Sequence, residues 1–260
     1  MEYTTEERRE RIVANIHENG KVRVSELSEE YDISEVTIRK DLEILEAEGH
    51  LKRVHGGAIG LNKLYVNMDL SERYKTNAGA KKTLAELAAS FIDDNDTIFM
   101  NAGTTLTYVL RAIRDKKNIS IVTNSVQNAT EAALYSSFNV ILLGGELDSK
   151  YQFTFGTDAE RQLENYRAAK CILSVDGICA DAGLTLYYAN EASLARKMIE
   201  YSAKTIVVAD SSKIGRGVFA RITDAKKTDF LVTNNSEKKK ELAALEKLGV
   251  KIFQTDEILK

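Results

Sequence analysis

Five short polar segments after residue 100 carry side chains that suit a small anionic ligand. Each follows an apolar run, and together they supply glycines, hydroxyls, carboxylates and a lysine. Glycine lets a backbone approach an anion closely, and hydroxyls beside a helix amino terminus can donate to phosphate oxygens. We therefore predict a site for a polyhydroxylated anion. Its residues are Asn101, Gly103, Thr104 and Thr105; Thr123, Asn124 and Ser125; Gly144 and Gly145; Asp176 and Gly177; and Lys213.

The elements that must position these segments alternate regularly along the chain. Strands are predicted at the short apolar runs 97–100, 119–122, 140–143, 171–175, 205–208 and 230–232, and helices at 81–91, 105–114, 126–135 and 192–202. Repeated β-α alternation indicates a parallel sheet covered by helices on both sides. Ligands of such sheets bind at the carboxyl ends of the strands, where the polar segments fall. Taken singly, each residue has a simpler explanation: Gly103 could allow a tight turn, Ser125 could cap a helix, and Lys213 could be a solvated charge. Their shared position at strand ends favours a ligand site.

The first sixty residues predict three helices followed by a hairpin. Thr5 is expected to cap the first helix, which ends near Gly20, and Ser25 to cap a second, short one. The third helix runs from Ser34 to Gly49, with its apolar stripe at 38, 42 and 45. Two short helices and a tight turn make a helix-turn-helix, and the strands 51–54 and 58–59 around His55 form a small wing.

Charge placement on the third helix favours binding of DNA. Thr37, Arg39 and Lys40 lie in its amino-terminal half, which is the part of a recognition helix that enters the major groove, and Glu43, Glu46 and Glu48 come later. On the wing, Lys52 and Arg53 could contact phosphates. The alternative is a solvated charged face on a three-helix bundle.

Composition limits the remaining possibilities. The 260 residues are 43% hydrophobic and 29% charged, which is typical of globular proteins, and no apolar run reaches the roughly 18 residues that span a bilayer. With a charged amino terminus and two cysteines that suit neither a disulfide framework nor a metal site, the chain is expected to be cytoplasmic. Residues 1–57 hold 9 Lys and Arg against 14 Asp and Glu, so DNA binding must come from locally placed cations.

The segments 34–42 and 48–58 resemble the winged helix-turn-helix of the DeoR family of bacterial transcriptional regulators. The resemblance implies binding to double-stranded operator DNA, with Thr37, Arg39 and Lys40 as groove or backbone contacts and Arg53 on the wing. Many members have two arginines at 39 and 40. Since a lysine lacks the bidentate fork of arginine, Lys40 is expected to contact a phosphate. The predicted DNA-binding set is completed by Ser34, Lys52 and His55.

The rest of the chain also resembles the effector domain of this family, whose fold is similar to that of ribose-5-phosphate isomerase. By this resemblance, 103–105 and 123–125 would hold the phosphate of a sugar, Asp176 and Glu191 would face the sugar, and Lys213 would close on the anion. Asn101 stands where Asp is frequent, and Ser174 where glycine is common. We expect an α/β chain: a winged helix-turn-helix domain at 1–58, a linker at 59–77 and an effector-binding domain at 78–260.

The leading hypothesis is a repressor of sugar-metabolism genes that a phosphorylated sugar releases from its operator, acting as a homodimer or homotetramer because operators are symmetric. Neither a metal nor a cofactor is predicted. An alternative is a sugar-phosphate isomerase in which Asp176 or Glu191 acts as base and Lys213 as electrostatic stabiliser. In sugar-phosphate isomerases of this kind, the corresponding segment is similar to Asp-Gly-Ala-Asp-Glu. Residues 176–180 lack the second pair of carboxylates in that pattern, which disfavours catalysis. A third possibility, an interaction module without DNA binding, requires that the Arg39 and Lys40 face be covered.

Overall fold

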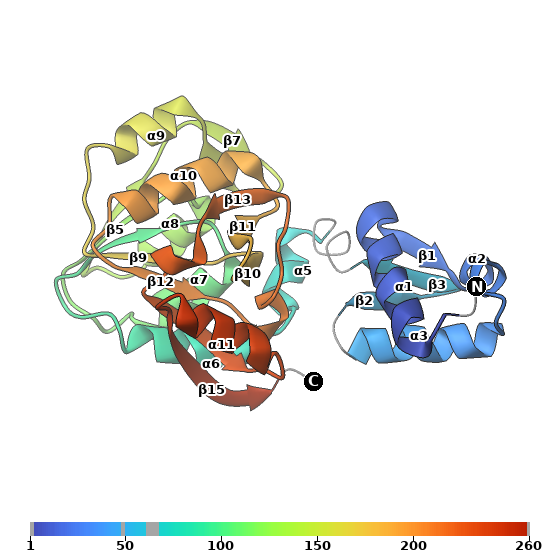
Figure 1. Cartoon of the computed structure of the whole chain (residues 1–260). Helices are drawn as coiled ribbons and strands as arrows, with labels where there is room; N and C mark the ends of the chain where they lie inside the picture. Colours follow the sequence, from blue (N-terminus) through green and yellow to red (C-terminus); the bar gives the residue numbers. More distant parts are fainter. Residues whose placement is uncertain (1–2, 48–49, 61–67, 259–260) are drawn as a thin grey trace. The chain divides into compact units, whose positions relative to one another are not determined.

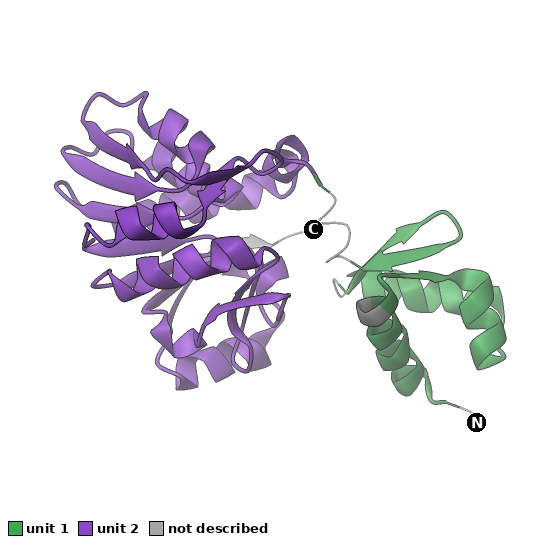
Figure 2. Ribbon diagram, turned by 90° about the horizontal axis from the view of Figure 1, so that it is seen from above, with its two compact units in different colours: residues 1–68 green, residues 69–260 purple. Residues whose placement is uncertain are grey.

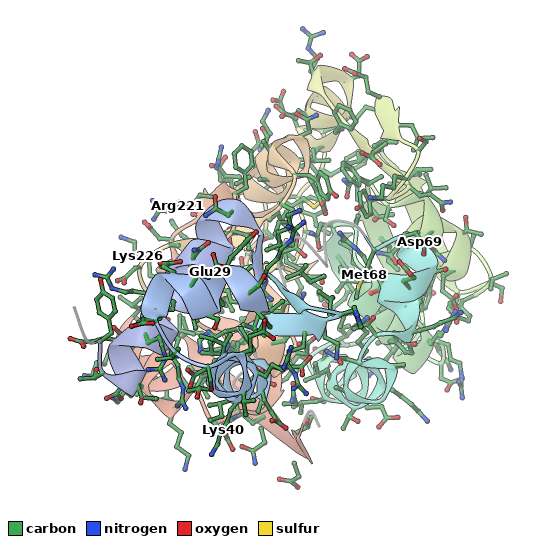
Figure 3. All side chains as sticks on the ribbon, turned by 90° about the vertical axis from the view of Figure 1, so that its right-hand side faces the viewer. Glu29, Lys40, Met68, Asp69, Arg221 and Lys226 are labelled. Atoms are coloured by element: carbon green, nitrogen blue, oxygen red, sulfur yellow. The ribbon has the colours of Figure 1, made fainter. Side chains whose placement is uncertain are left out.

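The computed structural model describes residues 3–47, 50–60 and 68–258, without the side chains of 17–18 and 257–258. The chain forms two compact units, Met1–Met68 and Asp69–Lys260 (Figure 1, Figure 2). The residues on either side of the division, Met68 and Asp69, are labelled in Figure 3.

The amino-terminal unit begins with α1 (Thr5–Asn19), and Thr4 rather than Thr5 caps it. Thr4 accepts a hydrogen bond from the Glu7 amide while the Glu7 carboxylate accepts one from the Thr4 amide, a reciprocal cap that a one-residue shift would lose. The strand β1 (Lys21–Arg23) follows. Helix α2 (Val24–Tyr31) starts one residue before Ser25, and no side chain caps it.

The third helix, α3 (Glu35–Ala47), follows Ser34 directly. Its buried residues Ile38, Leu42 and Leu45 pack with Ile12 and Ile16 of α1 in the core of this unit. The wing consists of β2 (Leu51–Val54) and β3 (Gly57–Gly60), which form an antiparallel three-stranded sheet with β1 in the order β1-β3-β2. The predicted helix end at Gly49 lies outside the described residues.

The second unit is built on a parallel seven-stranded sheet, with helices on both of its sides (Figure 1). The strand order is β15-β14-β12-β9-β4-β5-β6. Neighbouring strand residues alternate between two hydrophobic clusters, Phe99 and Val207 in one, Ile98 and Ile206 in the other, so both faces of the sheet are buried. The strands are β4 (Thr97–Met100), β5 (Ile119–Thr123), β6 (Phe138–Leu142), β9 (Lys170–Leu173), β12 (Thr205–Val208), β14 (Phe230–Asn235) and β15 (Lys251–Ile258).

Two helical layers cover the sheet. One face packs on α6 (Ala78–Ala89), α7 (Thr104–Ala112) and α8 (Val126–Ala132). The other packs on α9 (Thr157–Leu163), α10 (Ala189–Glu200) and α11 (Lys239–Lys247). Within the described part of the chain, no helix combines the length and apolarity needed to cross a membrane.

Several elements were not predicted. A hairpin pairs β7 (Glu146–Asp148) with β8 (Phe153–Phe155), and a small antiparallel sheet joins β10 (Gly177–Cys179), β11 (Gly183–Leu186) and β13 (Ala220–Thr223). Two single turns of 3-10 helix are η1 (Ser211–Lys213) and η2 (Ala225–Lys227). The helix α5 (Leu70–Lys75) lies inside the predicted linker 59–77, where Asp69 and Glu72 cap it reciprocally. The structure thus differs from the linker prediction, because the second unit already begins at Asp69.

Candidate functional site

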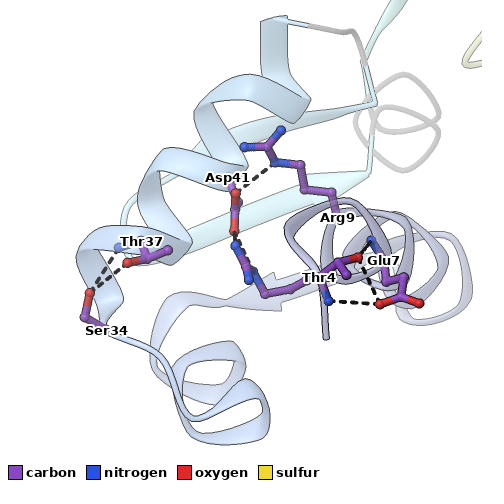
Figure 4. A network of polar contacts seen from close by, with 7 residues as sticks. Thr4, Glu7, Arg9, Ser34, Thr37 and Asp41 are labelled. Carbon is purple, nitrogen blue, oxygen red and sulfur yellow. Dashed lines mark hydrogen bonds and ion pairs between the residues drawn. The ribbon is translucent and has the colours of Figure 1, made fainter. Parts of the chain in front are cut away.

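The predicted DNA-binding residues of α3 are exposed on the surface of the first unit. These are Ser34, Thr37, Arg39 and Lys40. The hydroxyls of Ser34 and Thr37 lie 3.0 Å apart, and the Thr37 amide donates to Ser34 Oγ (Figure 4). Arg39 Nη2 lies 2.5 Å from Glu35 Oε2 on the preceding turn. Since both Arg39 and Lys40 are exposed in this unit, the condition for an interaction module without DNA binding is not met there.

Asp41, on the inner side of the same helix, fixes α3 to α1. Its carboxylate is buried and accepts hydrogen bonds from Arg8 Nε and Arg9 Nε, each at 2.8 Å (Figure 4). A buried carboxylate with two guanidinium donors replaces part of its lost hydration with directed bonds. The network therefore sets the position of α3, and with it the exposed residues on its outer side.

The wing cations are held by the carboxyl-terminal part of α3. Arg53 Nε lies 2.8 Å from Glu46 Oε2, and Lys52 Nζ lies 3.2 Å from Glu46 Oε1. Burial works against ionisation of Glu46, but the hydrogen bonds from Arg53 and Lys52 outweigh it and lower the pKa of Glu46 to about 2. A cavity of about 490 Å³ separates α3 from the wing and is lined by Arg39, Glu46, Lys52, Arg53 and His55, among others. Arg39, Lys52 and Arg53 therefore border one groove, whereas Lys40 does not line it, and His55 is exposed in the turn of the wing.

In the second unit, Asn101 connects the ends of β4 and β9 to α10. Asn101 Nδ2 donates to the Ser174 carbonyl oxygen at 3.0 Å and to Glu191 Oε1 at 3.2 Å, and Asn101 Oδ1 accepts from the Ser174 amide at 2.9 Å. Both Asn101 and Glu191 are buried. Asp176 lies at the end of β9 and accepts from the Tyr187 amide at 3.1 Å. Asn101, Asp176 and Glu191 therefore lie at the same edge of the sheet, where its parallel strands have their carboxyl ends.

The hydroxyl and amide side chains of the first two loops are all buried: Thr104, Thr105, Thr123, Asn124 and Ser125. Two of the oxygens already serve the local backbone, since Thr123 Oγ1 accepts from the Ser125 amide and Ser125 Oγ accepts from the Asn128 amide as the cap of α8. Asn124 Nδ2 donates to the Thr154 carbonyl. Among the described residues, its Oδ1 is buried without a hydrogen-bond partner. A buried unpaired acceptor suits a ligand hydroxyl.

The predicted glycines have steric reasons for their presence. A Cβ on Gly103 would lie 2.5 Å from the Cβ of Ser174, so this glycine lets the β4 and β9 loops touch. A Cβ on Gly177 would lie 2.4 Å from the Arg216 carbonyl oxygen. Gly145 has φ +134 and would clash with the Phe155 carbonyl, and the amide of Gly144 donates to Gln162 Oε1. Close packing thus accounts for Gly145 and Gly177 without a ligand.

Buried cations surround the strand ends. Lys213 is buried, and desolvation lowers the pKa of its amine to about 8 although Asp210 and Asp176 oppose the shift. Burial likewise lowers the pKa of Lys81 to about 8, with Asp210 opposing and Lys213 and Arg73 reinforcing the shift. Groups that perturb one another in this way lie close together. Arg73 is buried too, with its guanidinium carbon 4.3 Å from the Tyr151 ring centre.

Glu191 is the carboxyl group most affected by this environment. Burial raises its pKa to about 8, Asp176 adds to the shift, and Arg73 opposes it. At neutral pH Glu191 is therefore mostly protonated and can both donate and accept hydrogen bonds. The described residues contain no group of three or more His, Cys, Asp or Glu side chains that could hold a metal ion.

Comparison with known proteins identifies the family to which both units belong. The model of the DeoR-like helix-turn-helix domain matches residues 8–63, and the model of the DeoR C terminal sensor domain matches residues 76–235. The chain belongs to the DeoR family of transcriptional regulators. It is 36% identical to the uncharacterized HTH-type transcriptional regulator YulB of Bacillus subtilis, over 95% of each chain. It is 31% identical to a putative aga operon transcriptional repressor of Escherichia coli O157:H7, over 97% of this chain and 95% of that one.

Among solved structures, ribose 5 phosphate isomerase A from Neisseria gonorrhoeae covers 55% of this chain and 54% of its own, with 19% identity and a TM-score of 0.39. A likeness at this level carries no argument about function. Membership of the DeoR family, whose members matched here are named transcriptional regulators, supports a DNA-binding regulator and not the isomerase alternative.

Sequence reasoning missed three residues of this DeoR sensor domain that the structure places among the strand-end charges: Arg73, Lys81 and Arg216. Arg73 falls in the predicted linker, and Lys81 falls at the start of the helix predicted at 81–91. One signal was available: Lys81 and the apolar Leu84 and Ala85 lie three and four residues apart, which puts this lysine on the buried face of α6. In the DNA-binding domain, Val36 on α3 was also missed, and it is 73% exposed.

Proposed function

We propose that this DeoR-family protein is a repressor that binds operator DNA through α3 and the wing and is released by a phosphorylated sugar bound at the strand ends of its second unit. A regulator of this kind acts in the cytoplasm, and operator symmetry favours a homodimer or homotetramer. Relatives that match nearly the whole chain are named transcriptional repressors, and one of these names refers to the aga operon.

The observation that carries the effector proposal is the charge balance of the buried cluster. The cations are Arg73, Lys81, Lys213, Arg216 and Lys238, and the acids are Asp148, Asp176, Asp210, Glu191 and Glu241. Arg216, Lys238, Asp148 and Glu241 are partly buried, and the others are buried. Because Glu191 is mostly protonated at neutral pH, five cations face four other acidic side chains, which leaves an excess of positive charge. An excess of this kind is costly unless a counter-charge is bound. A phosphate monoester, with about −1.5 to −2 charges at neutral pH, supplies it.

The neighbouring groups fit the sugar part of such a ligand. Asn124 Oδ1 can accept from a hydroxyl, and Asp176 and the protonated Glu191 can accept from or donate to others. The hydroxyls of Thr104 and Thr105 belong to the first turn of α7, where the amide groups of a helix start favour a phosphate. A sugar without phosphate would leave the cationic cluster uncompensated and should bind much more weakly.

A thermal-shift experiment tests the effector proposal. The full chain would be heated with inorganic phosphate, with a panel of pentose and hexose phosphates, and with the corresponding free sugars. A ligand at 100 times its dissociation constant adds about 2.7 kcal/mol to the free energy of unfolding. We expect at least one phosphorylated sugar to raise the Tm and the free sugars to leave it unchanged. Stabilisation by free sugars alone would contradict the proposal.

Matched variants locate the site. Thr104→Val and Lys213→Ala should each weaken binding of the stabilising sugar phosphate about ten-fold to a hundred-fold, since a charge-assisted hydrogen bond contributes roughly 1.5 to 3 kcal/mol. Lys227→Ala is the control, because Lys227 is exposed and lies before β14, at the opposite end of the sheet. Equal loss in all three variants would show that the ligand binds elsewhere.

A further inference from the structure

The helix α5 (Leu70–Lys75) is held to the second unit mainly by polar contacts. It is the first element of that unit, directly after the division between Met68 and Asp69. Its single buried residue is Arg73, so apolar burial contributes little to its position. A six-residue helix is not stable on its own. Its position therefore depends on the groups that its polar side chains contact.

The first contact is a chain of four hydrogen bonds that ends at Glu191. Thr107 Oγ1 donates to Asn128 Oδ1 at 2.7 Å, so the 2.6 Å bond between Tyr74 and Thr107 has the Tyr74 hydroxyl as donor. Asn128 Nδ2 donates to the Asn101 carbonyl at 3.1 Å, and Asn101 Nδ2 donates to Glu191 Oε1 at 3.2 Å. All four donors point toward the carboxyl group. The chain passes through Asn101 from its backbone carbonyl to its side-chain amide, which are separate polar groups, so a change at Glu191 reaches Tyr74 through a shift of the Asn101 segment.

The second contact runs through the cations. Lys81 Nζ donates a short hydrogen bond to the carbonyl oxygen of Arg73, which lies in α5. The Arg73 guanidinium stacks on Tyr151, whose ring centre is 4.7 Å from that of Tyr188, the residue just before α10. Lys81 is close enough to Lys213 for the two charges to repel. An anion placed between these lysines competes with the Arg73 carbonyl for the Lys81 amine.

We propose that α5 couples the effector site to the DNA-binding unit: an anionic effector draws Lys81 from the Arg73 carbonyl, its hydroxyls replace the Asn101 side chain at Glu191 and loosen the Asn101 segment that Asn128 contacts, and two of the polar contacts of α5 are weakened. The chain that joins the two units leads directly into α5, so a change in this helix acts on the joining segment. The inference rests on the proposed function, because it requires an anion at the strand ends.

Hydrogen exchange on the full chain tests this coupling with two probes, inorganic phosphate and ribose 5-phosphate. When a probe binds, the amides of 101–107 and 123–128 should exchange more slowly. At the same time, amides of 72–76 should exchange about five-fold faster, as the loss of one net hydrogen bond predicts. Because the two regions are read separately, binding and coupling are distinguished in one experiment.

Two variants with matched controls assign the anchors. Tyr74→Phe removes the first hydroxyl of the chain and keeps the ring, so α5 should already exchange faster without a probe and respond less than two-fold to one. Tyr135→Phe removes a hydroxyl that donates to Glu131 on α8 and should behave as wild type. Lys81→Met should likewise abolish the response of α5, whereas the exposed neighbour Lys82→Met should retain it.

The outcomes separate the two proposals. Protected strand-end loops with unchanged exchange in 72–76 would overturn the coupling and leave the effector site in place. No protection by either probe, together with no Tm shift from any sugar phosphate, would overturn the proposed function and the coupling with it. A wild-type response in both Tyr74→Phe and Lys81→Met would show that α5 responds by another route and would refute the anchors proposed here.

Discussion

The side-chain amide of Asn101 lies between Glu191 and Ser174, 3.2 Å from the Glu191 carboxyl oxygen and 3.0 Å from the Ser174 carbonyl oxygen. Both of these partners are acceptors, so position 101 must present a donor to them. Asparagine does this, and its own oxygen also accepts from the Ser174 amide. An aspartate, which the family resemblance leads one to expect here, would place a carboxylate against the Ser174 carbonyl oxygen and, once Glu191 ionises near pH 8, against a second carboxylate.

Asn101→Asp should therefore destabilise the second unit in a pH-dependent way. We expect a loss of about 1 to 3 kcal/mol in the free energy of unfolding, because the donor is lost, and a larger loss at pH 8 than at pH 6, because both carboxyls then tend to ionise. Thermal unfolding at the two pH values measures it. Asn139→Asp is the control at an exposed site in β6. A smaller loss at pH 8 than at pH 6 would contradict the contact between residues 101 and 191.

The titration of Glu191 predicts how wild-type stability depends on pH. Burial raises the pKa of Glu191 to about 8, above that of an unfolded glutamate near 4.3, so the folded state holds a proton that the unfolded state releases. The contribution of Glu191 to stability is therefore complete below about pH 4 and falls as the pH rises from there toward 8, by at most about 1.4 kcal/mol per pH unit. Urea unfolding at a series of pH values should show that the free energy of unfolding of Glu191→Gln depends less on pH in this range. An unchanged slope would show that Glu191 is ionised in the folded protein.

Above pH 8 the buried lysines reverse the trend. Burial lowers the pKa of Lys213 to about 8, below the usual 10.4, so between these values the unfolded state binds the extra proton and stability rises with pH. The cluster should thus give a stability minimum near pH 8. Lys213→Met should reduce the rise in stability above pH 8 and leave the fall in stability between pH 5 and 8 unchanged. Bound phosphate should shift the minimum upward by keeping the lysine charged.

The sequence was sufficient to predict the alternating framework and the helix-turn-helix. Apolar residues such as Ile38 and Ile98 follow the periods of a helix stripe and of a doubly buried strand, and these periods depend on local geometry. The position of Asn101 and Asp176 at strand ends followed from the parallel topology. The bond between Asn101 and Glu191 could not be predicted, because 90 residues separate its partners and only the packed fold brings them together.

Packing explains why two cations of the candidate site were missed. Arg73 and Lys81 look like solvated charges in the sequence, yet the fold buries both, and no local pattern shows that an acidic Asp210 lies nearby to offset the cost. Packing also gives Gly145 and Gly177 a role that the sequence does not show, because the backbone of the chain itself approaches both glycines closely.

Removal of the Asp41 carboxylate should open the DNA-binding unit. Asp41→Ala leaves Arg8 buried without its partner, and a broken buried pair costs about 3 to 5 kcal/mol. Exchange of amides in α3 should become at least about a hundred-fold faster, with no change in the seven-stranded sheet. Glu35→Ala breaks an exposed pair in the same helix and should cost no more than about 1 kcal/mol. Comparable effects of the two variants would show that the buried network does not hold α3.

The last prediction distinguishes two contacts on neighbouring residues of α3. If Arg39 reads a base edge, Arg39→Ala should cost about 1 to 3 kcal/mol on an operator selected from random duplexes and relax the preference at one position. If Lys40 neutralises a phosphate, Lys40→Ala should weaken binding to all sequences alike and reduce the salt slope by about one. Electrophoretic shifts over a series of salt concentrations measure both quantities.

Glu35 supplies the control for this comparison. Its carboxylate holds Arg39 at 2.5 Å, in a pair whose two side chains are both exposed. Glu35→Gln releases the guanidinium and removes a negative charge from the amino-terminal half of α3, so affinity for random duplex DNA should rise. In the double variant with Arg39→Ala, the part of this rise that comes through Arg39 should disappear. Unreduced operator binding by the Arg39→Ala/Lys40→Ala protein would show that DNA does not contact this helix.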